Sequence, residues 1–141
     1  MSNLLIQNAT MLLPETTVVG DLLIESGIIS AIQPGGGLVA NGDVRIIDAT
    51  GLHLLPGLID PQVHFRDPGQ PEKEDLYTGS CAAASGGITS FLDMPNNVPS
   101  QTTLQSMHEK IATGNRRCVT NFGFFIGCLL YTSPSPRDVS R

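Results

Sequence analysis

The segment at 55–69 constrains the fold of this chain more than any other. It reads as a buried strand over 58–64, whose last residue, His64, is followed closely by Arg66 and Asp67. An apolar strand that delivers polar side chains to its carboxyl end is typical of the active sites of β/α barrels. These residue types predict a metal ligand beside an anion-binding arginine. The alternative is a hydrogen-bonded core histidine, which is commoner at strand ends.

After this strand the sequence alternates between helical and extended patterns. We expect helices over 74–85 and 103–113 and strands over 88–94 and 118–126. Acidic residues in the first turn of the first helix would favour its dipole. Three apolar residues fall on one face of the second helix and are expected in the core: Leu104, Met107 and Ile111. This alternation indicates an α/β fold, with parallel strands joined by right-handed crossovers, as at the start of a TIM-like (β/α)8 barrel.

The first 55 residues read instead as short strands, over 4–9, 21–25, 28–33 and 44–48. Ser26-Gly27 is a two-residue connection typical of a β-hairpin. We therefore expect part of a small β-sandwich over 1–55, followed by the first part of the barrel over 56–127.

Composition limits the functions available to the chain. It has 141 residues and a formal net charge of −5. A complete β/α barrel takes about 250 residues, so the sequence predicts a barrel truncated after its third strand. The acidic balance argues against nucleic acid or an anionic membrane as a partner. Without an apolar run near 18 residues or a signal peptide, the expected location is cytoplasmic.

Three cysteines, Cys81, Cys118 and Cys128, lack the spacing of a metal or redox motif. We expect Cys81 within a helix and Cys118 at the start of a strand, both as small buried hydrophobic residues in a reducing compartment.

Three separated stretches resemble type I dihydroorotases of the amidohydrolase superfamily, and they occur in the right order. The segment at 60–69 resembles the family's Asp-x-His-x-His-x-Arg-x-Pro-Gly motif. Residues 84–96 resemble its Gly-Gly-x-Thr…Met-Pro-Asn segment, and residues 121–127 resemble its third barrel strand. The resemblance implies a metal-dependent-hydrolase barrel preceded by a small β-sandwich domain.

The resemblance also implies a reaction and its cofactor. Dihydroorotases interconvert dihydroorotate and N-carbamoyl-L-aspartate in de novo pyrimidine biosynthesis, with one or two zinc ions. Zinc activates water and polarises the carbonyl of the cyclic amide. By resemblance, His64 is a metal ligand, and Arg66 and Asn96 bind the substrate carboxylate. From the residues alone, Arg66 has the alternative of a salt bridge with Asp67 or Asp60, and Asn96 that of a turn residue.

Gln62 departs from the family pattern, because it stands where the first histidine ligand is expected. A carboxamide is a neutral and weak zinc ligand. The chain resembles a subgroup that has glutamine here, so a single-metal enzyme, a rearranged site and a non-catalytic homologue all stay open. We assign no catalytic residue within the chain, and we do not expect residues 1–141 alone to bind zinc tightly, to turn over dihydroorotate or to stay fully folded and soluble.

Asp93 shares a strand face with Phe91 and would either support the site or cap a neighbouring loop, of which we favour the second. His53 and His108 look incidental, and His108 is expected to be solvated.

Residues 128–141 lie outside the resemblance. They are rich in serine and proline without periodicity, which predicts a disordered tail. They also resemble the translation of a transposase sequencing adapter, so we interpret them as non-native.

The sequence leaves three functions open. The first is a fragment of a dihydroorotase, acting on a small-molecule substrate. The second is another cyclic amidohydrolase, such as an allantoinase or a hydantoinase. The third is a non-catalytic dihydroorotase-like subunit of aspartate transcarbamoylase. The parent protein would assemble with copies of itself or with aspartate transcarbamoylase.

Overall fold

A computed structural model describes residues 3–127 of the chain. The chain divides into two compact units, with the boundary between Pro56 and Gly57. Each unit is described by itself below. The predictions made for residues 128–141 lie outside the described residues.

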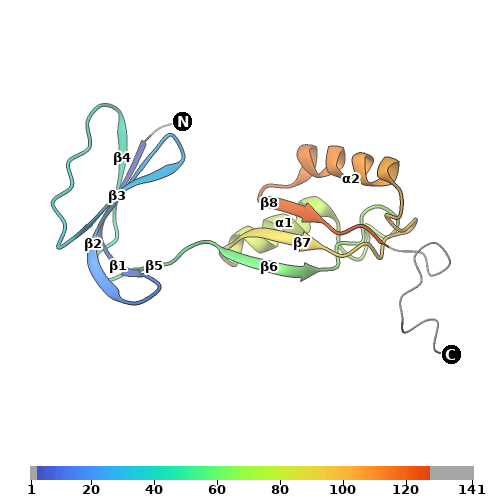
Figure 1. Cartoon of the computed structure of the whole chain (residues 1–141), viewed down its shortest axis with the longest axis horizontal. Helices are drawn as coiled ribbons and strands as arrows, with labels where there is room; N and C mark the ends of the chain where they lie inside the picture. The colour runs from blue at the N-terminus through green and yellow to red at the C-terminus, as the bar shows by residue number, and fades with distance from the viewer. Residues whose placement is uncertain (1–2, 128–141) are drawn as a thin grey trace. The chain divides into compact units, whose positions relative to one another are not determined.

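The N-terminal unit is a five-stranded sheet with the order β3-β2-β1-β4, in which β5 also pairs with β1 (Figure 1). Strands β1, β2 and β3 are antiparallel neighbours, whereas β4 and β5 run parallel to β1. The strands are β1 Asn3–Leu12, β2 Thr17–Glu25, β3 Ile28–Pro34, β4 Val44–Asp48 and β5 His53–Leu54. The β-sandwich stays a prediction, because the described part of this unit forms one sheet.

The predicted hairpin between β2 and β3 is confirmed. Ser26 and Gly27 form its two-residue turn, with φ of 53° and 81°. Two consecutive positive φ angles match the twist of the flanking strands, which explains glycine at the second position.

The core of the N-terminal unit contains Ala9, Met11, Leu22 and Ala49. A buried carboxylate, Asp21, lies beside this core on β2. It accepts hydrogen bonds from the main-chain N–H groups of Asn8 (2.9 Å), Gly37 (2.8 Å) and Leu38 (3.0 Å). Asp21 therefore fastens the glycine-rich loop that follows β3 to the sheet.

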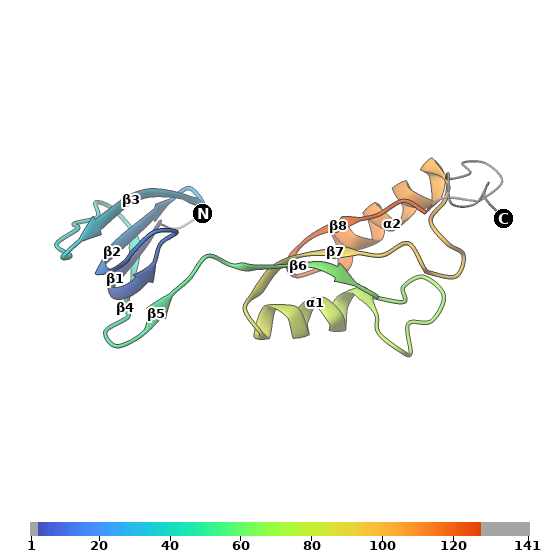
Figure 2. The ribbon, with the colours of Figure 1, turned by 60° about the horizontal axis from the view of Figure 1, so that its bottom comes forward.

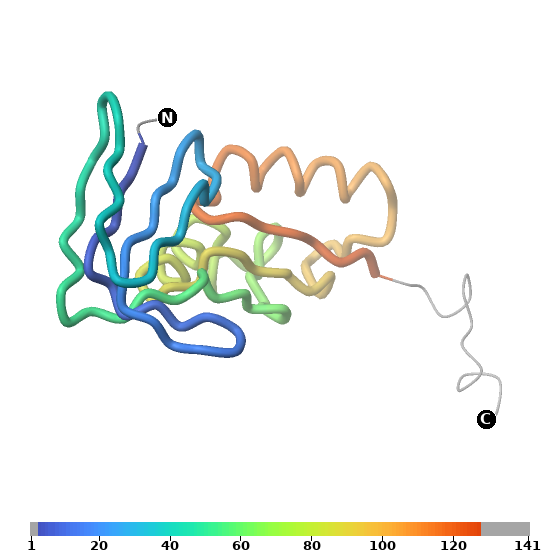
Figure 3. Tube along the Cα trace, turned by 60° about the vertical axis from the view of Figure 1, so that its left-hand side comes forward, coloured from blue at the N-terminus to red at the C-terminus, as the bar shows by residue number. Residues whose placement is uncertain are grey.

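The second unit has the order strand, helix, strand, helix, strand, and its strands form a parallel sheet in the order β6-β7-β8 (Figure 2). The elements are β6 Leu58–Val63, α1 Leu76–Ser85, β7 Ile88–Asp93, α2 Leu104–Arg117 and β8 Asn121–Phe124. The predicted α/β alternation is confirmed, and the tube in Figure 3 follows the crossover from β7 through α2 to β8. No described helix is long and apolar enough to cross a membrane.

Both helices pack on one face of this sheet. Phe91 on β7 lies against Leu76 of α1, in a cluster with Phe65 that Val63 and Phe122 border. The next residue on the same face of β7 is Asp93, which contacts α2. Because strand side chains alternate, Gln62 and His64 lie on the opposite side from Val63, away from the helices.

The limits of both helices differ from the sequence prediction. Helix α1 begins at Leu76 rather than at 74, because Asp75 is its N-cap and accepts from the N–H groups of Tyr77 (2.7 Å) and Thr78 (2.8 Å). The predicted acids in its first turn are therefore absent from the helix. Helix α2 runs on to Arg117, four residues beyond its predicted end at 113.

The predictions of burial for α2 and for the start of β6 were wrong. Leu104 and Ile111 on α2 are 73% and 39% exposed, because α2 turns Lys110 and Gly114 toward the sheet instead. Leu58 and Ile59 at the start of β6 are also exposed, because β6 has one neighbouring strand among the described residues. Strand β8 is likewise shorter than the predicted 118–126, since Cys118 caps the end of α2.

Candidate functional site

The chain alternates between buried and accessible residues just after β6. Phe65 and Asp67 are buried, whereas His64 is exposed and Arg66 is half-buried. The ring of Phe65 packs edge-on against Phe91, with centroids 4.8 Å apart. Burial of every second side chain directs His64 and Arg66 to the surface at the carboxyl end of the sheet.

His64, Arg66 and Asn96 meet at this end of the sheet. Nδ1 of His64 lies 3.1 Å from Oδ1 of Asn96, and Nη1 of Arg66 donates to the main-chain oxygen of Asn96 over 3.2 Å. An amide oxygen only accepts, so the His64 ring donates from Nδ1 and a neutral ring keeps a lone pair on Nε2. This arrangement leaves Nε2 free to ligate a metal ion.

The alternative salt bridges for Arg66 are not formed. Asp67 pairs with Arg117 instead, over 2.5 Å, and Asp60 accepts from the main-chain N–H of Gln62 over 3.0 Å. Among the described residues, Arg66 has no ion pair, so its guanidinium keeps donors for a ligand.

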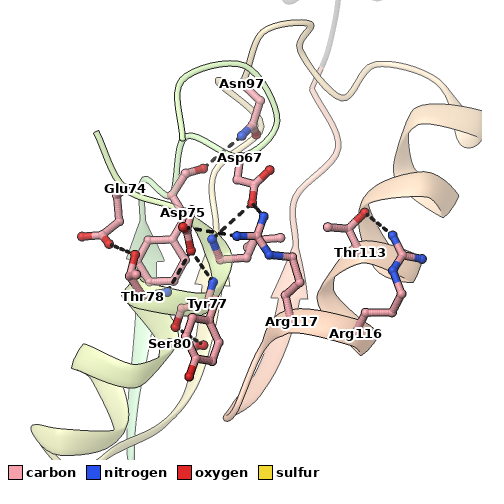
Figure 4. Close-up of polar contacts among 12 residues, drawn as sticks. Asp67, Glu74, Asp75, Tyr77, Thr78, Ser80, Asn97, Thr113, Arg116 and Arg117 are labelled. Carbon is pink, nitrogen blue, oxygen red and sulfur yellow. Dashed lines mark hydrogen bonds and ion pairs between the residues drawn. The ribbon is translucent and has the colours of Figure 1, made fainter. Parts of the chain in front are cut away.

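Arg117 joins the start of α1 to the site segment (Figure 4). Its guanidinium contacts the carboxylates of Asp67 and Asp75, the second over 3.2 Å. Asp67 also accepts from the N–H of Leu76 over 3.4 Å. The ion pair therefore fixes the residue that directly follows Arg66.

Comparison with known proteins gives the family. The model of the amidohydrolase family matches residues 53–131 of the chain. The chain belongs to the amidohydrolase family. It is 37% identical over 123 residues to a dihydroorotase from Methanosarcina acetivorans, covering 87% of this chain and 26% of that protein. It is 36% identical over 110 residues to a mitochondrial allantoinase from Aquarana catesbeiana, covering 77% and 22%.

Part of a solved structure has a fold similar to that of the chain. This structure is the L-hydantoinase (dihydropyrimidinase) from Arthrobacter aurescens, with a TM-score of 0.78, 28% identity and coverage of 90% of this chain and 28% of that one. The chain thus spans about a quarter of the length of the relatives it matches.

Amidohydrolases are generally metal-dependent, and the end of β6 offers part of a metal site. Within 3–127, no three histidine, cysteine, aspartate or glutamate side chains come together to hold a metal ion. His64 offers one good ligand, Gln62 is exposed and offers a weak one, and the Asp60 carboxylate is engaged by main chain. The described residues therefore fit one ligand of an amidohydrolase metal site and not a complete site.

Sequence reasoning missed Lys110, the most buried charged side chain of the second unit after Asp93. Its Nζ lies 2.6 Å from Oδ2 of Asp93, and both residues are almost fully buried. Burial raises the pKa of Asp93 and lowers the pKa of Lys110, and the contact between them opposes both shifts. The signal available was a lysine three residues after Met107, at the edge of the predicted apolar face. Helical periodicity alone reads such a lysine as solvated.

Asp93 caps the loop that follows β6, as in the reading we favoured, and this loop carries the candidate site residues His64 and Arg66. Its Oδ1 accepts from the main-chain N–H of Phe65 over 2.9 Å. His53 and His108 are exposed, as expected for His108. Cys81 lies within α1 as expected, whereas Cys118 ends α2 and precedes β8. Both cysteines are only partly buried, so the prediction that they are buried was wrong.

Proposed function

We propose that the chain supplies the carboxylate-binding side of a cyclic-amide hydrolase site of the dihydroorotase type. The observation that carries this proposal is the meeting of His64, Arg66 and Asn96, with no carboxylate on Arg66 among the described residues. The guanidinium of Arg66 lies near the candidate metal ligand His64 and has donors to spare. This arrangement suits a substrate that bears a carboxylate next to a reacting amide.

The three side chains would divide the work of binding. Arg66 would donate two parallel hydrogen bonds to the substrate carboxylate. Asn96 uses its Oδ1 for His64, so its Nδ2 group is directed to other acceptors and would donate to the same carboxylate. The bond from His64 holds the ring orientation, because a ligating imidazole is oriented by the partner of its other nitrogen. Together they would orient the cyclic amide at the strand end.

Zinc is the cofactor implied by the donor type and by the family, with His64 as one of its ligands. When bound, zinc lowers the pKa of a water molecule and polarises a carbonyl, so that an amide is hydrolysed near neutral pH. The other ligands and the proton-transferring carboxylate would come from outside residues 3–127. We further propose a cytoplasmic protein that binds no nucleic acid or membrane, and whose quaternary partners are its own copies or aspartate transcarbamoylase.

A second candidate function is a non-catalytic dihydroorotase-like subunit. Gln62 favours it, because a carboxamide is a poor substitute for a zinc-ligating imidazole. Restoring the ligand with Gln62→His separates the two candidates: an enzyme gains metal affinity or turnover, whereas a scaffold gains neither.

A chimaera tests the proposed reaction. Residues 3–127 would replace the matching part of the Methanosarcina acetivorans dihydroorotase, and hydrolysis of dihydroorotate, allantoin and hydantoin would be measured with zinc present. We expect dihydroorotate to be the preferred substrate. Arg66→Met should raise KM for dihydroorotate by about tenfold or more, because a charge-assisted bond to the substrate is lost.

The matched control is Arg45→Met, since Arg45 is exposed on β4 in the other unit. It should leave KM unchanged. A folded chimaera that hydrolyses only allantoin or hydantoin, or an Arg66→Met variant with unchanged KM, would refute the assignment of dihydroorotate.

A further inference from the structure

Lys110 uses all three N–H bonds of its ammonium group inside the second unit. Its Nζ donates to Oδ2 of Asp93 (2.6 Å), to Oδ1 of Asn97 (2.6 Å) and to Oε1 of Gln101 (3.3 Å). The ammonium also lies 4.8 Å from the centroid of the Phe124 ring. The side chain is thus fully satisfied, although the residue is only 3% exposed.

Two partners of Lys110 bind the main chain of the same residue of the site segment, Phe65. Asp93 accepts from the N–H of Phe65 over 2.9 Å, and Nδ2 of Asn97 donates to the carbonyl of Phe65 over 3.0 Å. Phe65 lies between His64 and Arg66 in the chain. Both polar groups of the residue between the two site side chains are therefore held by groups that Lys110 joins.

The same ammonium also fixes the segment after β7. Asn97 follows Asn96, whose side chain and main-chain oxygen contact His64 and Arg66. One buried cation therefore sets the position of the β7–α2 loop relative to the end of β6. A hydrophobic side chain of similar length would fill the same space without joining these two segments.

We infer that Lys110 is a positioning residue for the carboxylate site: it holds the segments bearing His64, Arg66 and Asn96 in register and thereby determines the affinity of the site for an anionic ligand. The inference rests on the proposed function for the identity of the ligand. The contacts that Lys110 makes are independent of that identity.

Lysine and aspartate variants test the inference in the chimaera with the Methanosarcina acetivorans dihydroorotase, because residues 1–141 alone are not expected to stay fully folded. Lys110→Met alone leaves Asp93 buried without its cation and is expected to lose stability. The informative variant is therefore the double change Asp93→Asn with Lys110→Met, which removes both charges and keeps an oxygen for the N–H of Phe65. Lys73→Met is the matched control, because Lys73 is exposed and contacts only Gln70 by its side chain.

Two measurements are made on each folded variant. The first is the contact between the His64 ring and the Asn96 side chain in the absence of ligand, observed by nuclear Overhauser effects. The second is the affinity for N-carbamoyl-L-aspartate, measured from the shifts of the main-chain amide NMR signals as the ligand is added. The double variant should lose the His64–Asn96 contact and bind about tenfold more weakly or worse, the scale expected when a supporting hydrogen bond is removed. Lys73→Met should change neither.

The outcomes separate the inference from the proposed function. A folded double variant that keeps both the contact and the affinity overturns the role of Lys110. If the unmodified chimaera and its Lys73→Met variant bind no N-carbamoyl-L-aspartate, the substrate proposal loses its support, and the ligand-free contact decides the inference alone. Loss of that contact in the double variant then supports the positioning role, and its persistence overturns it.

Discussion

The tight contact between Gly79 and Phe65 predicts the sign of the change in unfolding free energy when Gly79 is replaced by alanine. A Cβ atom added at Gly79 on α1 would lie 2.6 Å from Cε1 and 2.7 Å from Cζ of the Phe65 ring. Carbon atoms in contact prefer about 3.5–4.0 Å, so the ring would have to move by about 1 Å. Phe91 is already packed edge-on against the ring and opposes that movement.

The net effect of Gly79→Ala is a difference between two terms. Overpacking a core costs about 1–3 kcal/mol, whereas alanine favours a helix over glycine by about 1 kcal/mol. We expect the free energy of unfolding to fall by about 1 kcal/mol, measured by urea denaturation and circular dichroism. Helix propensity alone predicts the opposite sign, so the experiment decides which term dominates.

Two further variants isolate the clash. At Gly86, which ends α1 with φ of −89°, the nearest atom to an added Cβ is a carbonyl oxygen at 3.5 Å. Gly86→Ala should therefore change stability by less than about 0.5 kcal/mol. Combining Gly79→Ala with Phe65→Leu should cost less than the sum of the single changes, by about 0.5 kcal/mol or more. A Gly79→Ala variant as stable as the wild type, or strict additivity, would refute the steric argument.

Three other predictions concern carboxylates and a thiol. Asp75→Ala removes the N-cap of α1 and should cost about 1 kcal/mol in thermal unfolding, whereas Asp75→Asn should cost less; equal losses would contradict the capping role. The N–H of Asn8 is the main cause that lowers the pKa of Asp21 below its ordinary value of 3.8, with burial opposing it and Gly37 and Leu38 adding to it. The stability that the ionised Asp21 contributes is therefore present above pH 3.8 and lost as the pH falls through the folded pKa. Asp21→Asn should cost about 2 kcal/mol at pH 7 and weaken the dependence of the unfolding free energy on acid pH. An unchanged acid profile would contradict this role of Asp21. Burial raises the pKa of Cys118 to about 11, so peptide-resolved alkylation at pH 8 should be much slower in the folded chain than in urea, and equal rates would show that the thiol is accessible.

Much of the second unit could be predicted because its signals are local. The apolar run before His64, the glycines after α1 and the alternation of elements reflect backbone preferences that act over a few residues. Because β6 and β7 run parallel, the residues that follow them share one edge of the sheet, and the structure brings the side chains of His64 and Asn96 within 3.1 Å. Their roles in binding remain predictions.

What the sequence could not give depends on partners distant in the chain. Lys110 is buried only because Asp93, Asn97 and Gln101 converge on it from β7 and the following loop. Helical periodicity placed Leu104 and Ile111 in the core instead, since it ranks residues by hydrophobicity and ignores such partners. The short strand β5 was missed for a related reason: its two residues are extended by pairing with β1 and not by their own preference.

Buried and accessible side chains alternate over 64–67, so mutations at these four positions have two different consequences. Phe65 and Asp67 are tied into the interior, so a change there endangers folding of the strand end. His64 and Arg66 project from the same few residues toward solvent, where a substitution usually changes stability by less than about 0.5 kcal/mol. Mutations at the accessible positions can therefore alter what the strand end binds while the fold persists.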